Sequence, residues 1–211
     1  MFQPVDERDL VDRRVNELFA LVAEAIARGT DALLSGDVRS ARTVIDGDER
    51  VDQLTAQVEK LVWDRFEQAT TPANWRHLVG VLLILPELER SADLAEHVAQ
   101  RATSHLGIEM SPMSRGIVQR MADVAIEMWQ VVADAYCDRQ AVAEALEEAD
   151  EELDVLHDRL TNEVAGEAMT MPVGAQVTLL ARFYERLGDH AVNLARRIGS
   201  LPDEDANGVA R

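Results

Sequence analysis

Two acidic sequence patterns each occur twice in this chain, and they occur in the same order. Residues 48–54 (Asp-Glu-Arg-Val-Asp-Gln-Leu) return 102 residues later (150 − 48) as residues 150–156 (Asp-Glu-Glu-Leu-Asp-Val-Leu). Residues 89–95 (Glu-Arg-Ser-Ala-Asp-Leu-Ala) return 96 residues later (185 − 89) as residues 185–191 (Glu-Arg-Leu-Gly-Asp-His-Ala). Self-similarity over such a period predicts one structural unit that is used twice.

Each pattern places two carboxylates at positions i and i+4, which lie one turn apart on the same face of a helix. The pairs alone carry little information, because 39 acidic residues in a chain of 211 give about seven such pairs by chance. The information lies in the matching residues that flank them. We therefore treat the four acidic pairs as one repeated feature.

The composition and the breaker residues predict an all-α fold. Aromatic residues make up only 4% of the chain, which favours helix packing over a sheet. Asp37, Ser111 and Asp138 are suitable N-caps, and Pro112 and Pro172 suit the first turn of a helix. We expect six long helices at about residues 5–34, 38–69, 73–105, 112–137, 139–166 and 172–199.

Short connections between neighbouring helices predict antiparallel packing. The chain should then form two tandem and similar three-helix bundles, each running up, down and up. We place the first bundle at residues 1–107 and the second at residues 108–201, with a frayed tail at residues 202–211.

The formal net charge of −18 limits the choice of partners. Nucleic acid is excluded as an expected partner, because its affinity comes mainly from basic contacts with phosphates. Metal cations and basic protein surfaces suit such an acidic field. Cys137 is the only cysteine and the first 30 residues hold no apolar run, so we expect a cytoplasmic protein without a signal peptide or membrane span.

The repeated acids follow the apolar residues of their helices by one position, and so they should line the helix–helix seams. Carboxylates from two helices that converge there are hard oxygen ligands for Mg²⁺, Mn²⁺ or iron. The alternative is a network of salt bridges, because Arg90 and Arg186 lie inside the motifs and Arg182 lies one turn before Glu185. The residues alone leave both interpretations open.

Residues 178–195, which contain Glu185-Arg-Leu-Gly-Asp189-His-Ala, closely resemble the C-terminal signature of the PhoU family of phosphate-signalling regulators. The other acidic motifs and the two-fold repeat match that family as well. The resemblance implies sites for metal ions (iron, manganese, magnesium or zinc) in both bundles. Carried over residue by residue, the metal-binding acids are Asp48, Asp52, Glu89, Asp93, Asp150, Asp154, Glu185 and Asp189.

The same resemblance implies a cytoplasmic negative regulator of phosphate uptake and phosphate-starvation signalling. Such a protein would link the ATPase subunit of a phosphate ABC transporter to a sensor histidine kinase, and would form a homodimer. It would reach the membrane only through these partners. The first half departs from the family pattern, because His97 replaces the equivalent of Asn193 and Pro86 lies inside a predicted helix, where it should bend the axis.

Three alternatives remain beside this interpretation. A ferritin-like di-iron enzyme requires Glu-x-x-His on two helices, and the chain contains no such motif. A metal-free helical adaptor would use the acids only to dock a basic partner. An accessory protein of a different phosphate permease would share every motif. No catalytic motif of the hydrolase, zinc-protease or nucleotide-binding type is present, so we do not expect an enzyme.

Overall fold

The computed structural model describes residues 7–166 and 169–201. The expected tail at 202–211 lies outside the described residues. Within them there is no strand, and the all-α prediction is confirmed. The helices are α1 (Glu7–Ser35), α2 (Val38–Phe66), α3 (Pro72–Thr103), α4 (Leu106–Glu109), α5 (Pro112–Asp138), α6 (Ala143–Gly166) and α7 (Met171–Ile198).

Two of the three expected N-caps are confirmed. The Asp37 carboxylate accepts hydrogen bonds from the backbone N–H groups of Arg39 and Ser40, and the Ser111 hydroxyl accepts one from Ser114. The expected cap at Asp138 is wrong, because Asp138 is the last residue of α5. The next residue, Arg139, takes up the left-handed conformation (φ 55°), and its N–H bonds to the Ala135 carbonyl.

The connection between the halves contains a helical turn that the sequence patterns do not predict. The third long helix ends at Thr103, and His105 takes up a left-handed conformation (φ 61°). The one-turn helix α4 follows.

The second helix ends at Phe66, three residues before the expected end at Ala69. Pro86 lies inside α3, which continues through it as one helix.

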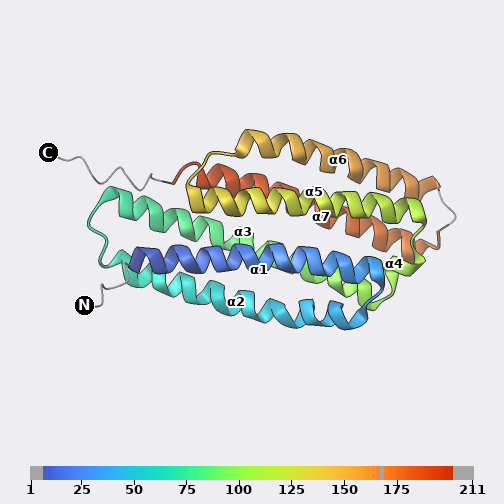
Figure 1. Cartoon of the computed structure of the whole chain (residues 1–211), viewed down its shortest axis with the longest axis horizontal. Coiled ribbons are helices and arrows are strands. Elements are labelled where there is room, and N and C mark those ends of the chain that lie inside the picture. Colours follow the sequence, from blue (N-terminus) through green and yellow to red (C-terminus); the bar gives the residue numbers. More distant parts are fainter. Residues whose placement is uncertain (1–6, 167–168, 202–211) are drawn as a thin grey trace.

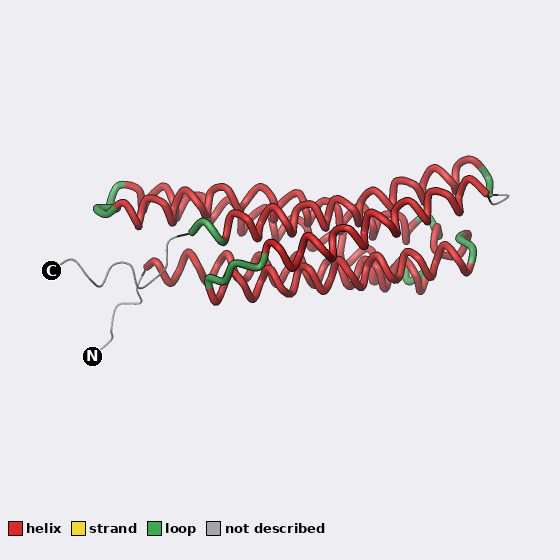
Figure 2. The backbone as a smooth tube through the Cα atoms, turned by 90° about the horizontal axis from the view of Figure 1, so that it is seen from above, coloured by secondary structure: helices red, strands yellow, loops and turns green. Residues whose placement is uncertain are grey.

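The helices pack as two groups of three, side by side (Figures 1 and 2). Helices α1, α2 and α3 contact one another, and so do α5, α6 and α7. The two groups meet where α1 packs on α5 and where α3 packs on α7. Helices α2 and α6 are therefore the outermost, on opposite sides of the molecule.

One continuous core runs through both groups. The Phe19 ring of α1 packs against Trp129 and Tyr136 of α5, with ring centroids 6.3 and 5.4 Å apart. The Trp129 indole donates to the Leu187 carbonyl at 3.1 Å. The Tyr184 hydroxyl of α7 shares a 2.7 Å hydrogen bond with Thr30 of α1. The packing of the Phe19 ring and the Tyr184 hydroxyl thus join the halves, whereas the Trp129 hydrogen bond lies within the second group. None of the described helices has the length and apolar character that a membrane crossing requires.

Candidate functional site

The first acidic group lies at the seam between α2 and α3. Asp48 is partly buried, whereas Asp52, Glu89 and Asp93 are exposed. Burial raises the pKa of Asp48 to about 6, and the nearby negative charges, with Asp93 the strongest, raise it in the same direction. The structure therefore brings Asp48 together with all three other acids predicted for this half.

The pKa of Glu89 is also raised. Burial is the largest cause, and the charges of Asp52 and Asp93 follow it, while Arg90 opposes them. Carboxylates on facing helices therefore oppose one another's ionisation. The electrostatic cost of ionising them together would be lowered by a bound cation.

The second group lies at the seam between α6 and α7 and repeats this pattern. Asp150 is partly buried, and burial together with the charges of Asp189, Asp154 and Glu185 raises its pKa to about 6. Asp48 and Asp150, at equivalent positions of the repeat, are thus both partly buried, and the pKa of each is raised to about 6. Two symmetric acidic seams therefore flank the α3–α7 contact.

Gly188 of α7 leaves space for side chains of the second seam. A Cβ atom at this position would lie 2.5 Å from Leu153 Cδ1 and 2.6 Å from Asp150 Oδ1. Real Cβ atoms essentially never show contacts this short. The absence of a side chain at Gly188 leaves the space in which the ends of the Leu153 and Asp150 side chains lie against α7.

The two carboxylate oxygens of Glu185 have different surroundings, one typical of a salt bridge and the other open to a metal ligand role. The Arg182 guanidinium bonds to its Oε1 atom, as the salt-bridge alternative predicts. Its Oε2 atom is buried and has no hydrogen-bond partner in the described residues. Burial is the largest cause that raises the pKa of Glu185, and Arg182 opposes it. One oxygen of Glu185 is thus satisfied, and the other remains available for a ligand.

The donor chemistry of both seams suits a hard cation, since carboxylate oxygens are the ligands that such ions prefer. The side chains are not assembled as a finished site. Among residues 7–166 and 169–201, no three Asp, Glu, His or Cys side chains stand close enough to hold a metal ion. A cation would have to draw the carboxylates together by rotamer changes on the exposed seam.

The structure adds two residues to the seams. Glu96, three residues after Asp93 on α3, raises the pKa of Asp48 by its charge. Its equivalent in the second half is Val192, so the repeat gives no signal for it. His157 lowers the pKa of Glu185. The Asp154-x-x-His157 spacing could have indicated this residue. The first half has no counterpart of it, so the repeat gives no support for a role of His157.

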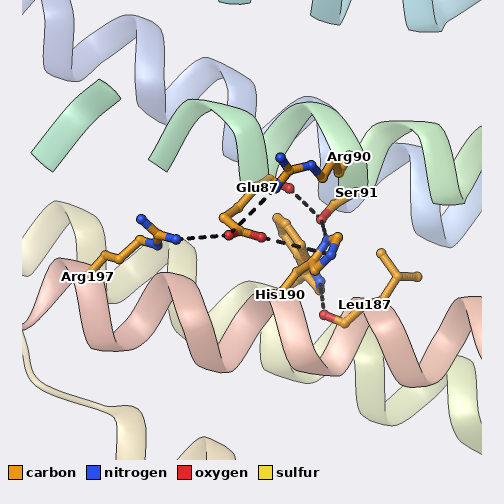
Figure 3. A network of polar contacts seen from close by, with 7 residues as sticks. Glu87, Arg90, Ser91, Leu187, His190 and Arg197 are labelled. Carbon is orange, nitrogen blue, oxygen red and sulfur yellow. Dashed lines mark hydrogen bonds and ion pairs between the residues drawn. The ribbon is translucent and has the colours of Figure 1, made fainter. Parts of the chain in front are cut away.

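A polar network joins α3 to α7 between the two seams (Figure 3). The buried Glu87 carboxylate accepts from Arg197 at 3.1 Å and lies 3.9 Å from the His190 ring. The other ring nitrogen of His190 is 2.8 Å from the Ser91 hydroxyl. Burial lowers the pKa of His190, and Glu87 opposes that shift. His190, next to the predicted ligand Asp189, thus points to the contact between the halves.

Fold and site together define an all-α protein with two repeated helical groups, each with an acidic seam. Residues 15–102 and residues 118–198 both match the PhoU domain. The chain belongs to the PhoU family.

Relatives with assigned names match along most of the chain. The phosphate-specific transport system accessory protein PhoU homolog 1 of Mycobacterium tuberculosis is 31% identical over 202 residues, which are 91% of each chain. Homolog 2 of the same species is 31% identical over 194 residues, covering 89% of this chain and 91% of its own. The homolog of Rhizobium meliloti is 28% identical, covering 92% and 84%.

Two crystal structures share the fold. The phosphate transport system regulatory protein PhoU from Streptococcus pneumoniae superposes with a TM-score of 0.81 at 21% identity, over 93% of this chain and 98% of that one. PhoU from Pseudomonas aeruginosa gives a TM-score of 0.83 at 23% identity, over 91% and 95%. At these identities the agreement establishes the arrangement of helices.

Proposed function

We propose that this chain is an accessory regulatory protein of phosphate-specific transport. The observation that carries the proposal is the match of both halves to one family, with relatives of that assigned role aligned along 91% of the chain. In finer detail, we propose a cytoplasmic negative regulator of the phosphate-starvation response. It would act as an adaptor, without catalytic turnover, between a phosphate ABC transporter and a sensor histidine kinase.

The charge and shape of the molecule support an adaptor. Long helix faces that lie side by side offer grooves and ridges to helices of a partner. The net charge of −18 would speed encounter with basic patches on a transporter ATPase subunit or on a kinase. That attraction would weaken with added salt, because exposed charges are screened beyond about 8–10 Å.

We further propose that the two seams take up cations as part of this role. The support is the pair of carboxylates with a pKa of about 6 and the unpartnered Glu185 Oε2 atom. Asp150, Asp154, Glu185 and Asp189 would hold the ion in the second half, and the equivalent acids would do so in the first. A bound cation would supply positive charge that removes the repulsion across the seam.

Metal uptake is tested on purified protein by titration with Mn²⁺, Fe²⁺, Mg²⁺ and Zn²⁺. Glu185→Gln and Asp189→Asn should lower the bound metal while the helical circular dichroism stays unchanged. Glu148→Gln is the matched control, because this acid on α6 is exposed and is not among the main causes of the raised pKa of Asp150. Full metal content in both seam variants would show that the seams are salt-bridge networks.

The regulatory role is tested by deletion of the gene, followed by growth in ample phosphate. Loss of a negative regulator should leave phosphate-responsive genes expressed and phosphate uptake uncontrolled. Reintroduction of the wild-type gene should restore both. A normal phosphate response in a strain without a second copy would reject the assignment. Co-purification would show whether the transporter is the phosphate ABC system or a different permease.

A further inference from the structure

A hollow of about 250 Å³ lies between α1, α2 and α3, beside Asp48 of the first acidic seam. Its apolar lining includes Val44 and Val51 of α2 and Ala92 of α3, which are buried. A Cβ atom at Gly47, which also lines it, would meet no atom within 4 Å. The hollow is therefore open space with an apolar wall, and we call it the α1–α2–α3 hollow.

Two carboxylates of the α1–α2–α3 hollow lack a cationic partner. Arg28 and Arg50, which also line the hollow, already pair with acids of α1 at 2.9 and 2.8 Å. Asp48 of α2 and Glu96 of α3 form no ion pair among the residues that the structure describes. The charge of Glu96 contributes to the raised pKa of Asp48, so each carboxylate opposes the ionisation of the other. The hollow thus offers two unpaired acids, from two helices, next to an apolar wall.

The residues that form the hollow differ from their equivalents in the second half. By the offsets of 102 and 96 residues, the pairs are Val44 and Leu146, Val51 and Leu153, Gly47 and Ala149, and Glu96 and Val192. In each apolar pair the second half has the larger side chain, and Leu146, Leu153 and Val192 are buried. The predicted metal-binding acids are common to both halves, whereas the small side chains and the additional acid occur in the first half only. The hollow therefore indicates a role that the second half does not share.

Charge and shape select the occupant of the α1–α2–α3 hollow. A bare metal ion requires oxygen ligands, and an apolar wall adds nothing to its binding. An arginine side chain matches both parts of the hollow, because its methylene stem packs on apolar surface while its planar guanidinium donates to carboxylates. A free small cation gains little at partly exposed carboxylates. Stable binding therefore requires further contacts, and a basic protein surface supplies them to a chain with a charge of −18.

We propose that the α1–α2–α3 hollow receives an arginine side chain from the basic surface of a partner protein. The guanidinium would lie between Asp48 and Glu96, and its stem would lie against Val44 and Val51. The proposal rests on the adaptor role for the source of the arginine, but the site itself can be tested without a partner. It assigns partner recognition to the first half, so the two acidic seams would differ in function.

Binding of n-butylguanidinium, which reproduces the end of an arginine side chain, tests the site on the full chain. A chelator is present, because Asp48 is also a predicted metal ligand. Titration followed by amide NMR should shift the signals of Gly47 and Asp48 saturably, with a Kd of ~10 mM for a ligand of this size. Neutral n-butylurea has nearly the same shape and should bind ~10-fold more weakly, because it lacks the charge. Equal binding of the two compounds, or shifts centred on the second seam, overturns the proposal.

The double variant Val44→Leu/Val51→Leu gives the hollow the side chains of the second half and keeps every acid. It should weaken n-butylguanidinium binding ~10-fold or more, because the stem loses its place, while the helical circular dichroism stays unchanged. Glu96→Gln leaves the hollow open and should weaken binding ~3-fold or more. Glu49→Gln is the matched control, because it removes the same charge from an exposed residue of α2 that does not line the hollow. Unchanged binding in both hollow variants, or equal weakening by Glu49→Gln, contradicts the assigned site.

The same double variant tests in the cell whether the arginine belongs to a partner of the regulator. In a strain where deletion of the gene leaves phosphate-responsive genes expressed, Val44→Leu/Val51→Leu should have the same effect at an unchanged protein level. Glu49→Gln should behave as the wild type. A normal phosphate response of the double variant in that strain would overturn the proposal and leave the regulatory role standing. A normal response after deletion itself would reject the regulatory role, and the proposed source of the arginine with it, whereas the n-butylguanidinium titration would still decide the site.

Discussion

At the scale of single residues, Asp48 and Asp150 are the acids of the repeated motifs whose pKa values are raised most. Each has a pKa of about 6, above its ordinary value of 3.8, first because of burial and then because of neighbouring carboxylates. Ionisation of either group therefore opposes folding. The stabilising contribution of each is complete below pH 3.8 and is lost as the pH rises through 6.

Asp150→Asn should therefore stabilise the metal-free protein above about pH 6. After allowance for solvent screening at this half-exposed site, the expected gain in the free energy of unfolding is ~1 kcal/mol at about pH 8, and it vanishes at about pH 4. Urea unfolding with a chelator present measures it at both pH values. Glu148→Gln should show no such pH dependence. A gain that is equal at both pH values would show that repulsion at the seam is not its cause.

At the scale of helices, two side chains of α6 end in the space that Gly188 of α7 leaves open. A Cβ at Gly188 would overlap the ends of the Leu153 and Asp150 side chains, whereas a Cβ at Gly116 in α5 would meet no atom within 4 Å. Both glycines lie inside helices, where glycine is less favourable than alanine. The two positions therefore separate the effect of side-chain overlap at the seam from the effect of helix propensity.

Gly188→Ala should lower the free energy of unfolding by ~1 kcal/mol, because the added methyl overlaps the ends of the Leu153 and Asp150 side chains, which have to rotate away. Gly116→Ala should be neutral or should stabilise by up to ~1 kcal/mol. Thermal and urea unfolding measure both. Gly188→Ala should also weaken any metal binding of the second seam, since Asp150 would be displaced. An equal change in the free energy of unfolding for both variants would mean that the Leu153 and Asp150 side chains move aside with no loss of stability.

At the scale of the whole molecule, the two groups of helices are joined by polar contacts as well as by the core. Arg197 of α7 reaches the buried Glu87 of α3 at 3.1 Å. The neighbouring Arg196 pairs with Glu147 of α6 at 2.7 Å, but both side chains are about half exposed. A buried carboxylate that loses its cation is costly, whereas an exposed pair contributes little.

Arg197→Gln should therefore destabilise the protein by ~1–3 kcal/mol, and Arg196→Gln by less than ~0.5 kcal/mol. Urea unfolding of the two variants measures this difference directly, because the substitutions are identical and adjacent. If Glu87 links the halves, the unfolding transition of Arg197→Gln should also become broader. Similar losses in both variants would indicate that the Glu87 carboxylate is stabilised by Arg90 and His190 without Arg197.

Local sequence patterns were sufficient to predict the all-α fold, the six long helices and the approach of acids from neighbouring helices at each seam. The reason is that periodic apolar residues, caps and prolines act within a few residues of one another. The start of α6 at Ala143 was beyond their reach, because Asp138 still belongs to α5 and Arg139 pairs with Asp12 of α1 at 2.9 Å. The same holds for Glu96 and His157, which join the seams, and for His190, which turns to Glu87. These outcomes depend on which helices lie side by side in the folded molecule, and the packing of distant segments is not encoded within a few neighbouring residues.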